Sequence, residues 1–327
     1  MDQTPLVKDA IPTVLVTGFL GAGKTTTINR LIAHLTSTWG ESTHTLAVLI
    51  NEFASIGIDG ELVPDAVSSL GGYHKIELNR GSIFCACIRT DFISELKKLA
   101  TDVQPDLLLI EATGIARVDD LYAMMSQDGL DRLLRIEKNI CVADATSFHK
   151  VERTLEAVAV QASYADVFIL NKTDRADAAL VERTEALLAA HNPKAPIYRA
   201  VRADVPFAEI LSPESGADAG LRARSGAPST NAAPEFHSAS MQFRGVFDSA
   251  KWRALASSFE PGRLLRAKGV IVYPEGPRYF EVVNGEYSEQ EAPASLAAKA
   301  VSVFTFITSD DLADSLSSRV RRCRIES

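Results

Sequence analysis

The chain has 327 residues, of which 46% are hydrophobic and 23% are charged, and its formal net charge is −8. This balance excludes a largely disordered chain, and the length suits about two domains. The net negative charge and the lack of long lysine or arginine runs argue against nucleic-acid binding. The sequence contains no run of about 18 apolar residues, so no membrane-spanning helix is predicted.

The first two thirds of the chain alternate short apolar runs with helical patterns. The expected strands are residues 13–17, 46–50, 107–110, 140–143 and 167–170. The expected helices between them include residues 24–37, 92–100 and 178–190. Short, continuously apolar strands that alternate with helices are typical of a mostly parallel sheet with helices on both faces.

A change in composition divides the chain. Residues 212–235 are rich in Ser, Pro, Gly and Ala, which is typical of a flexible linker. After them the expected strands are residues 236–243, 268–273, 279–283 and 301–308, and the expected helices are residues 250–259 and 310–319. We therefore predict a first domain over residues 1–211, a linker over 212–235, and a smaller C-terminal α+β domain over 236–327.

A phosphate-binding motif follows the first expected strand. The residues Gly18-Phe-Leu-Gly-Ala-Gly-Lys-Thr25 match G-x-x-x-x-G-K-[ST] and lead into a helix, which is the context that the motif requires. Glycines let backbone N–H groups surround a phosphate, and the helix N-terminus adds positive potential. Lys24 is expected to reach the β- and γ-phosphates, and Thr25 is expected to hold Mg²⁺. The expected nucleotide-binding residues of this loop are Gly18, Gly21, Ala22, Gly23, Lys24, Thr25 and Thr26.

These patterns together predict the fold class. A phosphate-binding loop between the first strand and the first helix of a parallel sheet is typical of a P-loop NTPase. We therefore predict an α/β fold of the P-loop NTPase type, with a mostly parallel sheet flanked by helices, followed by the smaller α+β domain.

A second motif points to the nucleotide base. Asn171-Lys-Thr-Asp174 follows the strand expected at residues 167–170. An aspartate there can accept hydrogen bonds from both the N1–H and the 2-amino group of guanine, whereas adenine would leave the carboxylate unpaired. The expected base-binding residues are Asn171, Lys172 and Asp174, so the predicted nucleotides are GTP and GDP. The alternative is a surface turn in which Asp174 caps a helix.

An acidic residue ends the strand expected at residues 107–110. Glu111 begins Glu-Ala-Thr-Gly114 and stands where P-loop proteins place an acid that binds Mg²⁺ directly or through water. Gly114 would let the backbone approach the γ-phosphate and move on hydrolysis. The expected catalytic residues are Lys24, Glu111 and Gly114. The alternative is that Glu111 caps a helix, and Asp144 is either a supporting or switch residue or a cap.

The four cysteines indicate the compartment. Cys85 and Cys87 have a C-x-C spacing that is too close for an easy structural disulfide. The N-terminus shows no basic segment followed by an apolar stretch, so no secretion signal is predicted. We expect a reduced, cytoplasmic protein. The basic cluster at residues 319–324 we interpret as a solvated helix end.

Four motifs in this order resemble the CobW-type GTPases, a metallochaperone-related group of P-loop proteins. The motifs are residues 18–26, Asn51-Glu-Phe53, Glu111-Ala-Thr-Gly114 and Asn171-Lys-Thr-Asp174. The resemblance covers nearly the whole chain, since residues 236–319 are similar to the C-terminal domain of the family. It implies a slow GTPase that delivers a divalent metal ion, zinc or cobalt, to a client metalloprotein, and it leaves open whether the chain forms a homodimer.

The resemblance also implies a metal site, from which this sequence departs. The family's metal motif is C-x-C-C, whereas the corresponding residues 81–89 have Ser82 and Phe84 where cysteines are expected. Zinc or cobalt in such a site requires four ligands, or three with an open position. The candidate ligands of the transported metal are Glu52, His74, Cys85 and Cys87. The alternative is that the two cysteines are a remnant without a metal.

Two functions other than metal delivery are compatible with a P-loop in this sequence. The alternative is a GTP-gated scaffold that binds a client but has lost metal transfer, and the altered cysteine motif supports it. A small-molecule kinase also uses a P-loop, but the N-K-x-D motif and the lack of an Arg-rich lid segment are arguments against it.

Overall fold

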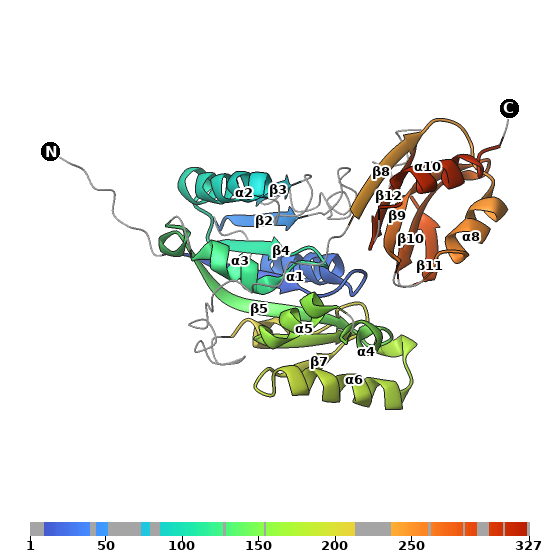
Figure 1. Ribbon diagram of the computed structural model, residues 1–327. Coiled ribbons are helices and arrows are strands. Elements are labelled where there is room, and N and C mark those ends of the chain that lie inside the picture. Colours follow the sequence, from blue (N-terminus) through green and yellow to red (C-terminus); the bar gives the residue numbers. More distant parts are fainter. Residues whose placement is uncertain are drawn as a thin grey trace. The chain divides into compact units, whose positions relative to one another are not determined.

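The computed structural model describes residues 10–39, 44–51, 73–78, 86–126, 129–153, 155–212, 237–260, 263–283, 285–292, 301–309 and 311–325. These residues form two compact units, one within residues 10–212 and one within 237–325 (Figure 1). The predicted linker falls almost entirely on residues 213–236, outside the described residues, so its boundaries remain predictions.

The first unit is built on a seven-stranded sheet in which every strand pairing is parallel. In spatial order its strands are β3 (Tyr73–Leu78), β2 (Leu46–Asn51), β4 (Leu107–Glu111), β1 (Ile11–Thr17), β5 (Leu134–Asp144), β6 (Val167–Asn171) and β7 (Ile197–Arg199). Its α-helices are α1 (Lys24–Trp39), α2 (Ala86–Lys98), α3 (Val118–Met125), α4 (Phe148–Val151), α5 (Glu156–Ser163), α6 (Ala178–His191) and α7 (Phe207–Ile210). The predicted α/β fold with a parallel sheet is confirmed.

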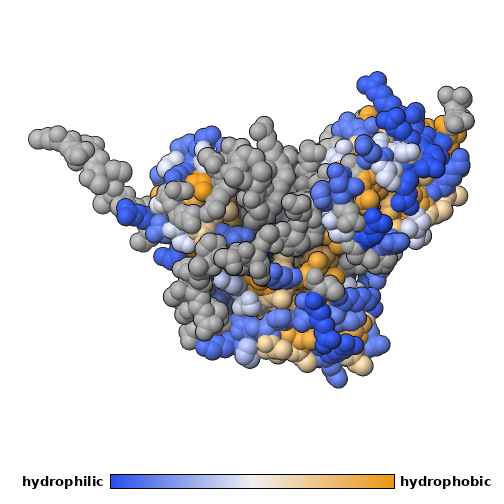
Figure 2. All heavy atoms as spheres, in the orientation of Figure 1, coloured by the Kyte–Doolittle hydropathy of each residue, from blue (hydrophilic) through white to orange (hydrophobic). Residues whose placement is uncertain are grey.

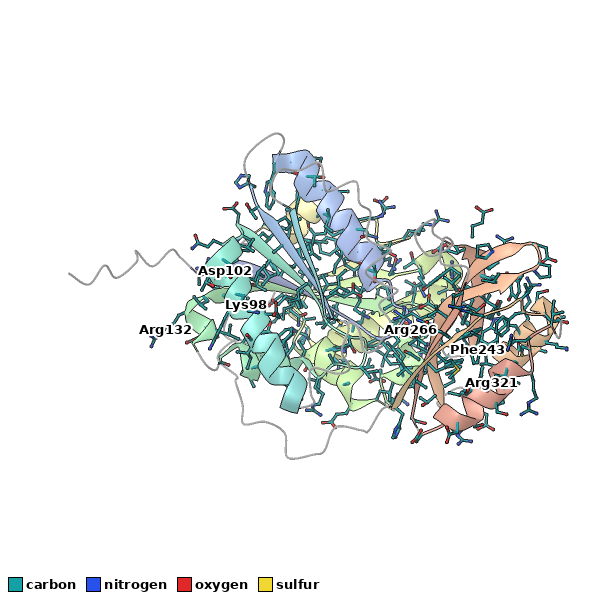
Figure 3. All side chains as sticks on the ribbon, turned by 90° about the horizontal axis from the view of Figure 1, so that it is seen from above. Lys98, Asp102, Arg132, Phe243, Arg266 and Arg321 are labelled. Carbon is teal, nitrogen blue, oxygen red and sulfur yellow. The ribbon has the colours of Figure 1, made fainter. Side chains whose placement is uncertain are left out.

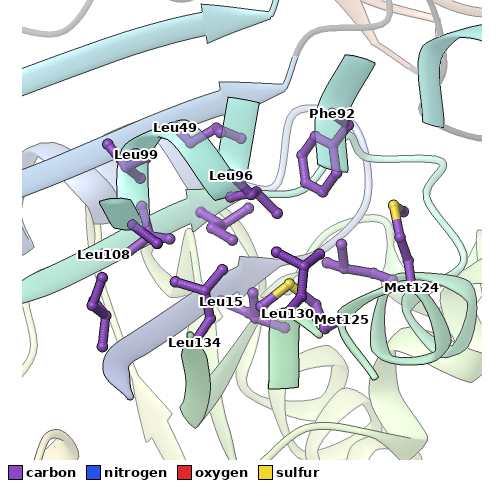
Figure 4. Packing of buried hydrophobic residues seen from close by; sticks show 14 of the residues in the cluster. Leu15, Leu49, Phe92, Leu96, Leu99, Leu108, Met124, Met125, Leu130 and Leu134 are labelled. Carbon is purple, nitrogen blue, oxygen red and sulfur yellow. The ribbon is translucent and has the colours of Figure 1, made fainter. Parts of the chain in front are cut away.

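Both faces of this sheet are buried, which explains the continuously apolar strands. One core cluster joins α2 and α3 to the sheet, and its members include Leu15, Leu49, Phe92, Leu108 and Met124 (Figure 4). Because successive side chains of a strand point to opposite faces, the buried neighbours Val14 and Leu109 point away from this cluster. Helix α1 contacts β1 and β4 and buries the side chains expected from its helical spacing, Ile28, Leu31, Ile32 and Leu35.

Two strands of this sheet were not predicted, and a third is longer than predicted. β3 and β7 lie at the two edges of the sheet, where β7 has only three residues and neither strand is a continuous apolar run. β5 starts at Leu134 rather than at residue 140 because its polar first half pairs with β1, beginning at Ile11 opposite Leu134. Pairing partners of this kind are distant in the sequence and leave no local signal.

The second unit is a five-stranded antiparallel sheet with the order β11-β10-β9-β12-β8. Its strands are β8 (His237–Phe243), β9 (Leu264–Tyr273), β10 (Gly276–Val283), β11 (Glu286–Glu291) and β12 (Ser302–Thr308). Helices α8 (Ser249–Ser257) and α10 (Ala313–Arg321) share one core with it, so the predicted α+β class is confirmed. The edge strand β11 was not predicted because its sequence, EYSEQE, is charged and mostly exposed.

Aromatic side chains form the centre of the second core. Trp252 is fully buried, and its ring centroid lies 4.6 Å from that of Phe280 and 5.0 Å from that of Phe304. At the end of α10, the Arg321 guanidinium lies 5.7 Å from the ring centroid of Phe243 (Figure 3). The basic cluster at residues 319–324 thus includes the last turn of α10, which agrees with the interpretation from the sequence. Its member Arg321 also makes a cation–π contact with a buried aromatic ring of the core.

Hydrophilic residues predominate around α10 on the face in Figure 2, and the exposed large hydrophobic residues among those described are Val201 and Ile325. Within the described ranges, every helix is too short or too polar to cross a lipid bilayer.

Candidate nucleotide-binding site

The phosphate-binding motif forms the turn between β1 and α1, as predicted. Gly18, Gly21 and Gly23 have φ values of +133°, +73° and +111°, in the region that favours glycine. A Cβ atom on Gly18 would lie 2.2 Å from the carbonyl oxygen of Val142, and one on Gly23 would lie 2.3 Å from Nδ2 of Asn171. The turn therefore requires glycine at both places, for its backbone angles and for its close neighbours.

Lys24 lies inside this turn. Its side chain is only 5% exposed, and its Nζ donates a hydrogen bond of 3.3 Å to the carbonyl oxygen of Phe19 within the same loop. The first turn of α1 thus directs an ammonium group over the loop's own backbone. A cation and glycine-rich backbone N–H groups at one helix N-terminus are suited to binding a phosphate.

Thr25 and Glu111 meet beside the loop. The hydroxyl of Thr25 donates to both carboxylate oxygens of Glu111, at 3.0 Å to Oε1 and 3.2 Å to Oε2. Glu111 is the last residue of β4, which is the neighbour of β1, and its side chain is buried. The alternative of a helix cap is wrong, because α3 begins seven residues later, at Val118.

Gly114 packs against the phosphate loop. A Cβ atom on Gly114 would lie 2.5 Å from the backbone nitrogen of Leu20, so only glycine fits without movement. The segment before it starts with a backbone hydrogen bond of 3.0 Å from Ala112 N to Val16 O, which continues the pairing between β4 and β1. The residues that follow Glu111 are thereby held beside the loop.

Asn171 ties the second motif to the phosphate loop. Its Nδ2 donates to the carbonyl oxygen of Ala22 at 2.9 Å, and its Oδ1 accepts from the N–H of Ala203 at 2.9 Å. The side chain is buried. The two sequence motifs, which lie about 150 residues apart, therefore form one site.

Lys172 is oriented by Asp144. Its backbone has a left-handed φ of 60°, and its Nζ lies 2.6 Å from Oδ2 of Asp144. The other carboxylate oxygen of Asp144 accepts from the N–H of Thr146 at 2.8 Å and from its hydroxyl at 2.7 Å. This geometry makes Asp144 a supporting residue for Lys172 rather than a helix cap, since the residue before α4 is Ser147.

Asp174 lies in a short 3-10 turn, Thr173–Arg175, and its side chain is exposed. Within the described ranges its carboxylate makes no hydrogen bond or ion pair. The cap of α6 is a different residue, Asp177, whose Oδ1 accepts from Leu180 N at 2.8 Å. The reading of Asp174 as a helix cap is therefore wrong, and its carboxylate stands at the surface beside Lys172.

One part of the site was missed from the sequence. In the loop after β7, the carbonyl oxygen of Ala200 accepts a hydrogen bond of 3.2 Å from the N–H of Thr173. The N–H of Ala203 donates to Oδ1 of Asn171. Arg202 and Ala203 both have left-handed φ values, 51° and 56°, which are uncommon for residues other than glycine. Strained backbone of this kind persists where surrounding contacts hold it. The sequence, with no glycine there, gives no signal of this loop.

The candidate ligands of a transported metal are only partly placed. Glu52 and Cys85 lie outside the described residues, while His74 is in β3 and Cys87 is in the first turn of α2. Within the described part of the chain, no group of three or more His, Cys, Asp and Glu side chains is arranged to hold a metal ion. The metal ligands therefore remain a prediction.

The two cysteines whose side chains the structure describes differ from the candidate metal ligands because they are buried. Cys141 and Cys323 are free and buried. Burial raises the pKa of the Cys141 thiol to about 12, so this thiol stays protonated at neutral pH. Cys141 lies on β5 near the phosphate loop, and no group of three or more His, Cys, Asp and Glu side chains that could hold a metal ion includes it among the described residues.

Comparison with known proteins agrees with this geometry. Residues 12–199 match the family model described as "CobW/HypB/UreG, nucleotide-binding domain". The match covers β1 through β7, and thus the phosphate loop, Glu111 and the N-K-x-D motif.

Three curated relatives show how far the similarity extends. The zinc-regulated GTPase metalloprotein activator 1 of Dictyostelium discoideum is 25% identical over 62% of this chain and 48% of its own length. The zinc chaperone YeiR of Escherichia coli is 31% identical over 50% of this chain and 47% of its own length. The zinc chaperone CobW of Pseudomonas aeruginosa is 26% identical over 82% of this chain and 78% of its own length.

The chain spans about half the length of the first two relatives. The family assignment depends on the model match, which covers more than half of the chain and includes the whole phosphate loop and base motif. The chain belongs to the CobW/HypB/UreG family of nucleotide-binding proteins.

Proposed function

We propose that this protein binds and hydrolyses GTP, with a slow intrinsic rate, and uses this cycle to deliver a divalent metal ion to a client metalloprotein in the cytoplasm. The observation that carries the nucleotide part is the contact between Thr25 and Glu111 at the N-terminus of α1. The names of the three relatives support zinc as the cargo. Cobalt is supported only by the resemblance of the motifs.

The residues present fit a magnesium ion. A threonine hydroxyl and a carboxylate are the hard oxygen ligands that Mg²⁺ takes in nucleotide sites, and Thr25 and Glu111 bring them together. When bound with GTP, Mg²⁺ supplies positive charge at the phosphates. The loop's backbone N–H groups and Lys24 bind the same phosphates, and Asp174 recognises guanine.

Replacing Glu111 with glutamine tests this assignment. The neutral amide is a weaker ligand for a divalent cation, so the gain in GTP affinity on adding Mg²⁺ should fall about tenfold, while GTP affinity in EDTA stays unchanged. Titration of a fluorescent GTP analogue with and without Mg²⁺ measures both quantities. Glu95→Gln, on α2, is the matched control. An unaltered magnesium effect in Glu111→Gln would remove Glu111 from the site.

Metal delivery is tested by titrating the reduced protein with Zn²⁺ and Co²⁺, with and without a non-hydrolysable GTP analogue. We expect stoichiometric binding that is lost in a variant with Cys85→Ala and Cys87→Ala together. A variant with Cys141→Ala and Cys323→Ala should retain it, because those thiols are buried. If the first double variant binds as well as the wild type, the cysteine site is wrong. If the wild type binds neither ion, a GTP-gated scaffold is the better assignment.

A further inference from the structure

A buried glutamine on α5 faces the segment that follows Glu111. Gln161 is only 1% exposed. Its Nε2 donates to the carbonyl oxygen of Ala116 at 2.8 Å and lies 3.4 Å from that of Gly114. Among the described residues its Oε1 has no hydrogen-bond partner. The polar contacts of this side chain are thus directed at one stretch of backbone, residues 114–116.

The same helix holds the end of that segment. The Arg117 guanidinium, 6% exposed, lies 2.8 Å from Oε1 of Glu156 at the start of α5 and 2.7 Å from Oδ2 of Asp119. The two carboxylates raise the pKa of Arg117 although its burial lowers it, so the guanidinium stays charged and paired with them. Helix α5 therefore holds the segment at two places, through Gln161 in its middle and through Glu156 at its end.

The same segment also meets the phosphate loop. Gly114 packs so tightly against the backbone of Leu20 that a Cβ atom would lie 2.5 Å from the nitrogen of Leu20. Gln161 and the loop residues Gly18, Leu20 and Ala22 line a common pocket. Gly114 is thus clamped by two contacts, with the backbone of Leu20 close to its Cα and with Gln161 at its carbonyl oxygen.

We propose that Gln161 is a positioning residue that fixes Gly114 against the phosphate loop, so that the N–H of Gly114 is preset to bind the terminal phosphate of GTP. The inference rests on the proposed function, since it requires a nucleotide in the loop. A backbone donor contributes to binding and catalysis when its orientation is fixed before the ligand arrives. GDP lacks the terminal phosphate, so losing the clamp should weaken GTP binding but spare GDP binding.

The variant Gln161→Met keeps the length and volume of the side chain and removes both N–H donors. We expect about a tenfold loss of affinity for a non-hydrolysable GTP analogue, a lower kcat, and an unchanged Kd for GDP. In the wild type, hydrogen exchange of the Ile115–Arg117 amides should slow on addition of the GTP analogue but not of GDP, and in Gln161→Met this difference should shrink. The control Gln104→Met removes an exposed glutamine beyond α2 and should match the wild type.

Glu156→Gln provides a second variant whose change is at a half-exposed site, so it should fold even where Gln161→Met does not. It weakens the ion pair between Glu156 of α5 and Arg117 at the end of the segment. We expect the affinity for the GTP analogue to fall about twofold to threefold and the affinity for GDP to stay unchanged. Equal losses for GDP and the GTP analogue, or no loss for either in both variants, would overturn the inference. Failure of the wild type to bind any guanine nucleotide would instead overturn the proposed function, and the inference with it.

Discussion

Replacing Lys24 with alanine is expected to lower the rate of GTP hydrolysis by about 10²–10³-fold, the range seen when a donor aimed at developing negative charge is removed. Lys24 is nearly fully buried, and its ammonium group donates to the carbonyl oxygen of Phe19 within the phosphate loop. In such a sheltered place a positive charge interacts more strongly with phosphate oxygens than it would in water. GTP affinity should fall in the same variant. Phosphate release under single turnover and equilibrium binding measure the two effects.

The matched control for this variant is Lys98→Ala. Lys98 is exposed at the end of α2, and among the described residues it pairs with Glu95 one turn before, so its removal should leave hydrolysis unchanged. Because Lys24 is buried, thermal unfolding of Lys24→Ala must be compared with that of the wild type. A correctly folded variant that hydrolyses GTP within a factor of a few of the wild-type rate would exclude Lys24 from the reaction.

The conformation of the phosphate loop could be predicted because its signal is local. A glycine-rich turn between an apolar strand and a helix determines its own shape, and Gly18, Gly23 and Lys24 lie in that shape in the structure. The position of Glu111 followed from the same logic, since the ends of neighbouring parallel strands meet at one edge of a sheet. Its contact with Thr25 bridges 86 residues of sequence, yet Glu111 directly follows a predicted strand and Thr25 ends the phosphate-binding motif at the start of a predicted helix.

Other parts of the site could not be predicted, because their signal lies in tertiary contacts. Asp144 became interpretable only when its ion pair with Lys172 was visible. In the sequence, nothing distinguishes Gln161 from other polar residues on short helices. Its role depends on hydrogen bonds to the carbonyl oxygens of Gly114 and Ala116, which are distant in the sequence. The loop at Arg202 and Ala203 is held in left-handed backbone by partners on β6, which no local pattern encodes.

Replacing Asp174 with asparagine should change the base that the protein recognises. The carboxylate can accept two charge-assisted hydrogen bonds from guanine, and each contributes about 1.5–3 kcal/mol. Asparagine keeps one uncharged oxygen that can accept from N1–H, but it turns a donor toward the 2-amino group, so both contacts weaken and GTP affinity should drop about 10²–10⁴-fold. The new amide can donate to the 2-oxo group of xanthine, which replaces the 2-amino group of guanine, so the variant should bind XTP more tightly than GTP. Competition binding with GTP, XTP and ATP measures this reversal.

Asp177→Asn is the control, since it makes the same chemical change three residues further along the chain. Asp177 caps α6 through Leu180 N, and asparagine caps a helix about as well, so neither GTP affinity nor stability should change much. A different result is expected from Asp177→Ala, which should lower the free energy of unfolding by about 0.5–2 kcal/mol and still leave base preference intact. If Asp174→Asn keeps its preference for GTP over XTP, the exposed carboxylate beside Lys172 does not recognise the base, and the N-K-x-D motif of this chain would serve only to join the loops through Asn171.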